Sequence, residues 1–186
     1  TLIGLLFRFY HPQRGAIFLD GVDIESIPLD ELRSRMGLVL QDIILFPGTI
    51  RDNLRLDDDS IGDSTVLNAL STVGASQLVN RNDEGLNSEL SEHGSNLSVG
   101  ERQLLSFARA LVHEPDILIL DEATSSVDPL SETRIRDAMK TLLSGRTSLV
   151  VAHRLQTILD SDCIIVIRDG KIVEQGKHHE LQAEKG

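Results

Sequence analysis

The sequence predicts an α/β domain in which a largely parallel sheet carries an inserted helical segment. Four of five strand-like runs are continuously apolar rather than alternating, which is typical of strands buried on both faces of a parallel sheet. Helical patterns alternate with these runs, an order that favours a layered α/β arrangement. Strands are predicted over 16–20, 37–41, 117–121, 148–153 and 163–167. Helices are predicted over 2–10, 100–113, 131–143 and 155–160.

Two regions depart from this alternation. The stretch from Gln41 to Leu97 is polar and helix-prone, and it contains no long buried strand. We therefore expect residues 1–46 and 115–186 to form the sheet domain, and residues 47–114 to form a helical subdomain inserted into it. Near the carboxyl end, the pair Asp169-Gly170 separates two apolar runs, which predicts a β-hairpin at the sheet's edge.

The composition limits the classes of partner. The chain has 186 residues and a formal net charge of −11, from 18 Lys plus Arg and 29 Asp plus Glu. This acidity argues against electrostatic binding of nucleic acid or anionic lipid, so we expect no nucleic-acid partner. No apolar run approaches the roughly 18–20 residues of a membrane span. Because the chain begins with Thr1 instead of Met, we expect it to be a fragment of a longer protein.

Two consecutive carboxylates follow the strand predicted over 117–121. Ligands gather at the carboxyl ends of strands in open α/β sheets, so Asp121 and Glu122 stand where a metal site is expected. Asp121 would hold Mg²⁺, directly or through water, because Mg²⁺ prefers oxygen ligands. Glu122 would orient and deprotonate an attacking water. The alternative is an acidic loop after a strand.

The helix predicted over 100–113 opens on Ser98 and Gly100. Serine is a favoured helix N-cap, so a capped amphipathic helix is the simplest interpretation. Glycine inside the first turn costs about 1 kcal/mol relative to alanine, and the close approach of a ligand to the backbone would explain it. Since helix N-termini attract anions, the ligand we expect here is a phosphate.

Three further polar residues have both a structural and a chemical interpretation. Gln41 ends an apolar strand, where its neutral amide is able to hydrogen-bond a metal-bound water or a γ-phosphate, so it joins Asp121 as a candidate for the metal site. His153 ends another apolar strand, where its imidazole is able to donate to a phosphate oxygen. Strand-terminal polar residues with no such role are the alternative. Asp128 precedes Pro129 and suits a turn and helix N-cap, or a loop that reaches a partner subunit.

Together these residues resemble the nucleotide-binding domain of an ABC transporter. The run L-S-V-G-E-R-Q resembles the LSGGQ signature, with Val99 at its usual first glycine and Glu101 at its glutamine. The run I-L-I-L-D-E resembles a Walker B motif that ends on the catalytic glutamate, here Glu122. The resemblance extends over nearly the whole chain and implies a RecA-like P-loop NTPase core.

The remaining motifs follow in the family's order. Asp128 closes a run similar to the D-loop, Gln41 is similar to the Q-loop glutamine, and His153 is similar to the switch histidine. The runs L-F-P-G-T-I-R-D-N-L (45–54) and S-E-H-G (91–94) resemble the exporter forms of the Q-loop segment and the X-loop.

One motif of the family is absent from this chain. The Walker A loop, G-x-x-x-x-G-K-[ST], is missing, and Thr1 is expected to be the last residue of a G-K-S-T run. The lysine and the backbone amides of the Walker A loop, which hold the phosphates, are therefore missing as well. The resemblance therefore implies that residues 1–186 bind ATP poorly on their own.

The resemblance implies an ATPase that uses ATP and Mg²⁺. Gln41, Asp121, Glu122 and His153 would serve the nucleotide of their own domain. The signature residues would close on the nucleotide of a second such domain in a head-to-tail dimer; they are Leu97, Ser98, Val99, Gly100 and Glu101. Membrane-spanning domains upstream in the same polypeptide would couple hydrolysis to export, at the cytoplasmic face of the cell membrane.

Three alternatives share some of these motifs. A soluble ABC ATPase, such as an SMC-type head, would carry a long coiled coil where this chain has a compact insertion. An importer subunit would usually lack the exporter segments at 45–54 and 91–94. The third alternative is a truncated, inactive fragment. Glu122 and His153 argue against a degenerate parent protein, which would not be expected to keep both, but they do not argue against a nonfunctional fragment of an intact parent.

Overall fold

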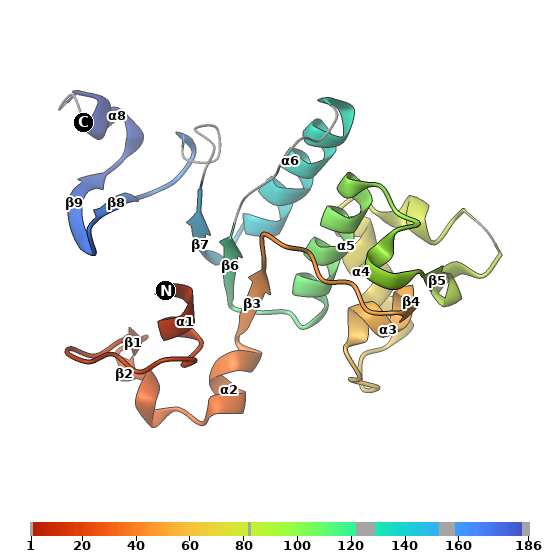
Figure 1. The fold of residues 1–186 in the computed structure, drawn as a ribbon, viewed down its shortest axis with the longest axis horizontal. Helices are drawn as coiled ribbons and strands as arrows, with labels where there is room; N and C mark the ends of the chain where they lie inside the picture. Colours follow the sequence, from red (N-terminus) through yellow and green to blue (C-terminus); the bar gives the residue numbers. More distant parts are fainter. Residues whose placement is uncertain (1, 82, 122–128, 153–158, 184–186) are drawn as a thin grey trace. The chain divides into compact units, whose positions relative to one another are not determined.

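The computed structural model describes residues 2–81, 83–121, 129–152 and 159–183. The chain divides into two compact units, residues 1–150 and residues 151–186, and each is described by itself. The helices are α1 Leu2–Leu6, α2 Leu29–Ser34, α3 Ile50–Arg55, α4 Asp63–Thr72, α5 Val99–Val112, α6 Pro129–Leu143 and α8 His178–Ala183 (Figure 1). The strands are β1 Phe18–Leu19, β2 Val22–Asp23, β3 Met36–Val39, β4 Gly48–Thr49, β5 Glu89–Leu90, β6 Ile117–Asp121, β7 Thr147–Val151, β8 Ile164–Arg168 and β9 Lys171–Gly176.

The first unit is built on a three-stranded sheet with the order β3-β6-β7. β3 and β6 are parallel, and their register runs from Met36 opposite Ile117 to Val39 opposite Leu120. Successive side chains point to opposite faces of a strand, and both faces of β6 are covered. Leu118 and Leu120 join the larger apolar core, whereas Ile119 joins the smaller one. This two-sided burial confirms the prediction from the continuously apolar run.

The larger core surrounds α5, which contacts α3, α4, α6 and β3 (Figure 1). Its apolar residues recur at helical spacing, so one broad face is available for packing. The buried side chains include Leu104, Leu105, Phe107 and Leu111. The helix predicted over 100–113 is therefore confirmed, with its start one residue earlier.

The segment between β3 and α5 is mainly helical. It contains α3 and α4, several 3₁₀ turns and the short antiparallel pair β4–β5. α3 begins in a capping box, in which Thr49 accepts from the backbone N–H of Asp52 while the Asp52 carboxylate accepts from the N–H of Thr49. Arg51 and Arg55 both reach the Asp63 carboxylate at the start of α4, at 2.9 and 2.7 Å. The cap and these ion pairs fix α3 against α4.

The helix predicted over 2–10 is wrong in its length, because α1 ends at Leu6. Arg8 adopts a left-handed conformation with φ 51°. The backbone N–H of Phe9 donates to Gly4 O, and that of Arg8 donates to Leu5 O. This is a Schellman ending, and its left-handed position is usually occupied by glycine. With arginine there, the sequence carries no stop signal.

The strand predicted over 16–20 is present but shorter, because β1 covers only Phe18–Leu19 and is the first arm of a short antiparallel hairpin with β2. Asp20 and Gly21 both have positive φ, 48° and 81°, as a two-residue type I′ turn requires. The same pair, Asp169-Gly170, joins β8 and β9 with φ 51° and 74°. The predicted carboxyl-terminal hairpin is thus confirmed, but among the described strands β8 and β9 pair only with each other and not with the edge of the larger sheet. The same dipeptide signal also forms the amino-terminal hairpin.

Three smaller differences concern the other predicted elements. β3 ends at Val39, two residues before the predicted end at Gln41. In the second unit, Ile165 and Ile167 on β8 are about half exposed, so this strand is not buried on both faces as predicted. A two-stranded sheet has too few neighbours to cover both faces. Residues 155–158 of the helix predicted over 155–160 lie outside the described residues.

Replacing Asp63 with asparagine is expected to remove a pH-dependent part of the stability. Hydrogen bonding from Arg51 holds the pKa of Asp63 below its ordinary value of 3.8. The contribution is therefore complete above pH 3.8 and is lost as the pH falls through the lower folded-state pKa. Urea unfolding should show wild type more stable than Asp63→Asn at neutral pH, with the difference vanishing in strong acid. Asp59→Asn is the control, and a difference independent of pH would contradict the assignment.

Candidate functional site

Four of the predicted site residues lie outside the described residues. They are Thr1, Glu122, Asp128 and His153, and their roles stay predictions. The described ones are Gln41, Asp121 and the signature residues 97–101.

Gln41 and Asp121 lie at the same edge of the sheet. The register pairs Val39 with Leu120, so Asp121 is the next residue of β6 and Gln41 follows the end of β3 by two residues. Gln41 is exposed, and Asp121 is half-buried at the carboxyl end of its strand. Because β3 and β6 are parallel neighbours, the chain brings both residues to the edge of the sheet where ligands bind in open α/β sheets.

The signature segment is held by a capping box at the start of α5. The Ser98 hydroxyl accepts from the N–H of Glu101 at 3.3 Å, and the Glu101 carboxylate accepts from the N–H of Ser98 at 2.9 Å. Glu101 also forms an ion pair with Arg81. Leu97 is buried below the cap, while Ser98 and Val99 are exposed. The capping box and the buried Leu97 thus fix the first turn, while Ser98 and Val99 remain exposed to solvent.

The loop before this cap is braced by two side chains. Arg102 Nη1 donates to Leu97 O at 2.8 Å and to Gly94 O at 3.3 Å. The Asn96 amide donates to Glu89 O and accepts from the N–H of Ser91. The S-E-H-G turn is therefore tied to the same helix turn that presents the signature residues.

Gly100 has a packing role. A Cβ at this position would stand 3.0 Å from the Ser131 Cβ and 3.2 Å from its Oγ, which is closer than ordinary van der Waals contact. α5 and α6 therefore approach each other closely here, and only glycine fits without displacement. This explains a glycine in the first turn without a ligand.

Arg109 is a residue that the sequence interpretation missed. It lies on α5, and burial lowers the pKa of its guanidinium below the ordinary value. It contacts backbone carbonyls of the segment that follows Gln41. The available signal was an arginine within the densest apolar part of a helix, where a charge requires a specific set of acceptors.

The carboxylate of Asp121 is chemically suited to the predicted magnesium site. Mg²⁺ is usually held by one or two carboxylates together with waters and substrate phosphates, so a single half-buried carboxylate is a sufficient protein contribution. Within the described ranges, no three His, Cys, Asp or Glu side chains come together as a metal cage.

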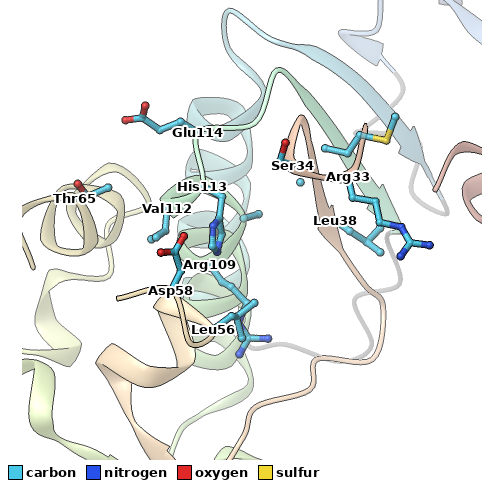
Figure 2. A pocket seen from close by; sticks show the side chains of 13 residues that line it. Arg33, Ser34, Leu38, Leu56, Asp58, Thr65, Arg109, Val112, His113 and Glu114 are labelled. Carbon is cyan, nitrogen blue, oxygen red and sulfur yellow. The ribbon is translucent and has the colours of Figure 1, made fainter. Parts of the chain in front are cut away.

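A hollow of about 680 Å³ lies elsewhere, at the amino end of β3 and the carboxyl end of α5. Figure 2 shows Asp58 and His113 pointing toward one another on one side of it, and Arg33 on another. Gln41 and Asp121 lie at the carboxyl ends of β3 and β6 instead, and neither they nor the described signature residues 97–101 line this hollow. This concavity is therefore separate from the candidate site.

Comparison with known proteins shows matches along the whole chain. Residues 1–125 match the family model described as ABC transporter. Over all 186 residues the chain is 49% identical to a probable multidrug resistance ABC transporter ATP-binding/permease protein of Bacillus subtilis. It is 44% identical to an ATP-dependent lipid A-core flippase of Neisseria meningitidis and 45% identical to a fatty acid ABC transporter ATP-binding/permease protein of Mycobacterium tuberculosis. The chain spans 28–30% of the length of these relatives.

The fold matches a solved structure as well. The chain superposes on a bacterial Atm1-family ABC exporter with ATP bound at a TM-score of 0.88 and 39% identity, covering 100% of this chain and 32% of that one. The match confirms the predicted α/β fold of P-loop NTPase type. In the part of the chain that the structure describes, no helix is both long and apolar enough to cross a membrane.

Gly100→Ala is expected to destabilise the chain, and Ser131→Gly is expected to rescue it. The added methyl group overpacks the α5–α6 contact, a change that typically costs about 1–3 kcal/mol, partly offset by the better helix propensity of alanine. Removing the Ser131 Cβ makes room for it. Urea unfolding of both single variants and the double variant should give a coupling energy of about 1 kcal/mol or more.

Arg136→Gly is the matched control, because it places a glycine on the exposed face of α6 away from Gly100. Its effect should add to that of Gly100→Ala without coupling. Equal coupling for both glycines would contradict the close approach at Ser131.

Proposed function

Because this chain belongs to the ABC transporter family, we propose that it is the ATP-binding and ATP-hydrolysing domain of an exporter that works as a head-to-tail dimer. In this proposal residues 1–46 and 115–186 form the RecA-like core, and residues 47–114 form the helical subdomain that carries the signature. The observation that carries the proposal is the register of β3 and β6, which brings Gln41 and Asp121 to one sheet edge while α5 presents a capped, exposed Ser98.

The hydrolytic roles follow from the chemistry of these positions. Glu122, directly after Asp121, would accept the proton of the attacking water. His153 would donate a hydrogen bond to a phosphate oxygen, and Gln41 would orient the water with its neutral amide. Asp121 would hold Mg²⁺, which neutralises phosphate charge when bound. Thr1 would bind the nucleotide as the last residue of the Walker A run, and Asp128 would bind it from the D-loop that reaches the partner subunit.

The signature face would act on the nucleotide of a second domain. Ser98 exposes its hydroxyl, and the amides of the first turn carry the positive end of the α5 dipole. A γ-phosphate delivered by a partner domain would meet these groups and draw the two domains together. Hydrolysis would remove that phosphate charge, so the dimer would reopen.

Membrane-spanning domains are the second partner in this proposal. Several relatives are named ATP-binding/permease proteins, and the chain spans under a third of their length. Ile44 and Phe46 are each about half exposed on the segment that follows Gln41, and they offer an apolar contact to an intracellular helix of such a domain. This arrangement would place the chain at the cytoplasmic face of the cell membrane.

Glu122→Gln in the full-length protein is expected to abolish ATP hydrolysis while leaving ATP binding intact. Removing a general base typically costs about 10²–10⁴-fold in rate. Phosphate release and binding of a fluorescent ATP analogue are the two measurements, and Glu114→Gln, an exposed carboxylate after α5, is the control. Hydrolysis at the wild-type rate in Glu122→Gln would refute this role for Glu122. An inactive wild-type protein would refute the proposed function as a whole.

Two variants of Ser98 separate its capping role from its nucleotide role. Aspartate caps helices as well as serine, so Ser98→Asp should keep the stability of wild type, whereas Ser98→Ala should lose about 1 kcal/mol. The aspartate would repel the partner's γ-phosphate, so Ser98→Asp should lose nearly all hydrolysis in the full-length protein. Urea unfolding and phosphate release measure the two effects, and wild-type hydrolysis by Ser98→Asp would contradict the nucleotide role.

A further inference from the structure

The guanidinium of Arg109 is a largely buried cation held by neutral acceptors. Its Nε donates to Asn53 O at 2.9 Å, Nη1 donates to Ile44 O at 2.8 Å, and Nη2 donates to Asn53 Oδ1 at 3.1 Å. The Phe46 ring lies over it, with 5.7 Å between the ring centroid and the guanidinium carbon. Among the described residues, no carboxylate lies within ion-pair distance of Arg109.

Asn53 extends this network through the whole segment. Its side chain is almost fully buried, at 1% exposure. Asn53 Oδ1 accepts from the N–H of Phe46 at 2.9 Å, and Nδ2 donates to Phe46 O and Thr49 O at 2.8 and 3.1 Å. One side chain therefore closes the turn that leads from Phe46 into α3, and Arg109 connects that turn to α5.

Separating these two parts would be costly. If residues 44–53 moved away from α5, the guanidinium would lose all of these acceptors while its helix remained packed in the apolar core. A buried charge without partners is among the least favourable states in a protein. The segment and the helix are thus far more easily displaced together than apart.

We propose that Arg109 is a positioning residue that joins residues 44–53 to the signature helix α5, so that the two move as one body. Arg109 lies about 16 Å along the helix axis from Ser98. A push on the exposed faces of Ile44 and Phe46 would therefore reach the signature residues through the helix, without passing through Gln41. The use of this motion in export rests on the proposed function; the mechanical connection does not.

The test is Arg109→Lys in the full-length protein, followed by hydrogen–deuterium exchange. A lysine ammonium is a single point donor and cannot reach three acceptors in the fork geometry of arginine. We expect backbone amides of residues 44–56 to exchange about tenfold faster, the factor that loss of one hydrogen bond to a charged group produces. Amides in the middle of α5 should change by less than about twofold, since the apolar packing of the helix remains.

Function is read in the same samples. The affinity for a fluorescent ATP analogue should stay within about twofold of wild type. Phosphate release per bound nucleotide should fall about tenfold or more, because a hydrogen bond to a charged group that helps to close the dimer is lost. Arg136→Lys is the matched control, because Arg136 is exposed on α6 and lies outside both residues 44–56 and α5. It should leave both the exchange pattern and turnover near wild type.

The outcomes separate this proposal from the proposed function. Equal acceleration in residues 44–56 and in α5 would mean general destabilisation and would overturn it, as would unchanged exchange in both. Accelerated exchange with unchanged turnover per nucleotide would overturn the claim of transmission. If wild type does not hydrolyse ATP, the proposed function fails, while the exchange data still decide whether Arg109 joins the two parts.

Discussion

The elements of the larger core, α3, α4, α6 and β3, depend on the burial of α5. Leu105 and Ala108 are completely buried and Phe107 nearly so. α3 and α4, which precede α5 in the chain, and α6, which follows it, all pack on this helix. At full burial, each large apolar side chain contributes about 1.5–3 kcal/mol. The same helix starts at the signature residues and carries Arg109 farther along. A single buried helix therefore positions both the exposed first turn and the segment after Gln41.

The regular parts of this fold were readable because their signals are local and consistent. The predicted strand 117–121 coincides with β6, whose run of apolar residues has no other stable location than between two covered faces. The errors have two different causes. Arg8 ends α1 in a left-handed conformation that arginine does not favour, so the packing of the folded chain decides this position and the sequence carries no signal for it. The turn at Asp20-Gly21 is different, because its dipeptide signal stands in the sequence and was not used.

The residues of the candidate site were likewise predicted where a local pattern marks them, and missed or misinterpreted where their role depends on neighbours in the folded chain. Ser98 as a cap was predictable from the S-x-x-E pattern, and the carboxyl ends of the strands located Gln41 and Asp121. Gly100 was correctly singled out, but its reason is the approach of Ser131, a residue on the next long helix of the chain. Arg109 was missed because its acceptors, Ile44 O and Asn53, become neighbours only in the folded chain. The proposed roles of Glu122 and His153 still depend on the resemblance.

The neutral acceptors around Arg109 have a consequence for ionic strength. Dissolved salt weakens attraction between exposed opposite charges, as in the pairs of Arg51 and Arg55 with Asp63. Within the described part of the chain the guanidinium of Arg109 has no carboxylate partner for salt to screen, and the carbonyls of Ile44 and Asn53 that accept from it are neutral. The surface of the helical region thus responds to the salt content of its surroundings, while the connection inside it keeps nearly the same strength in dilute and concentrated solution.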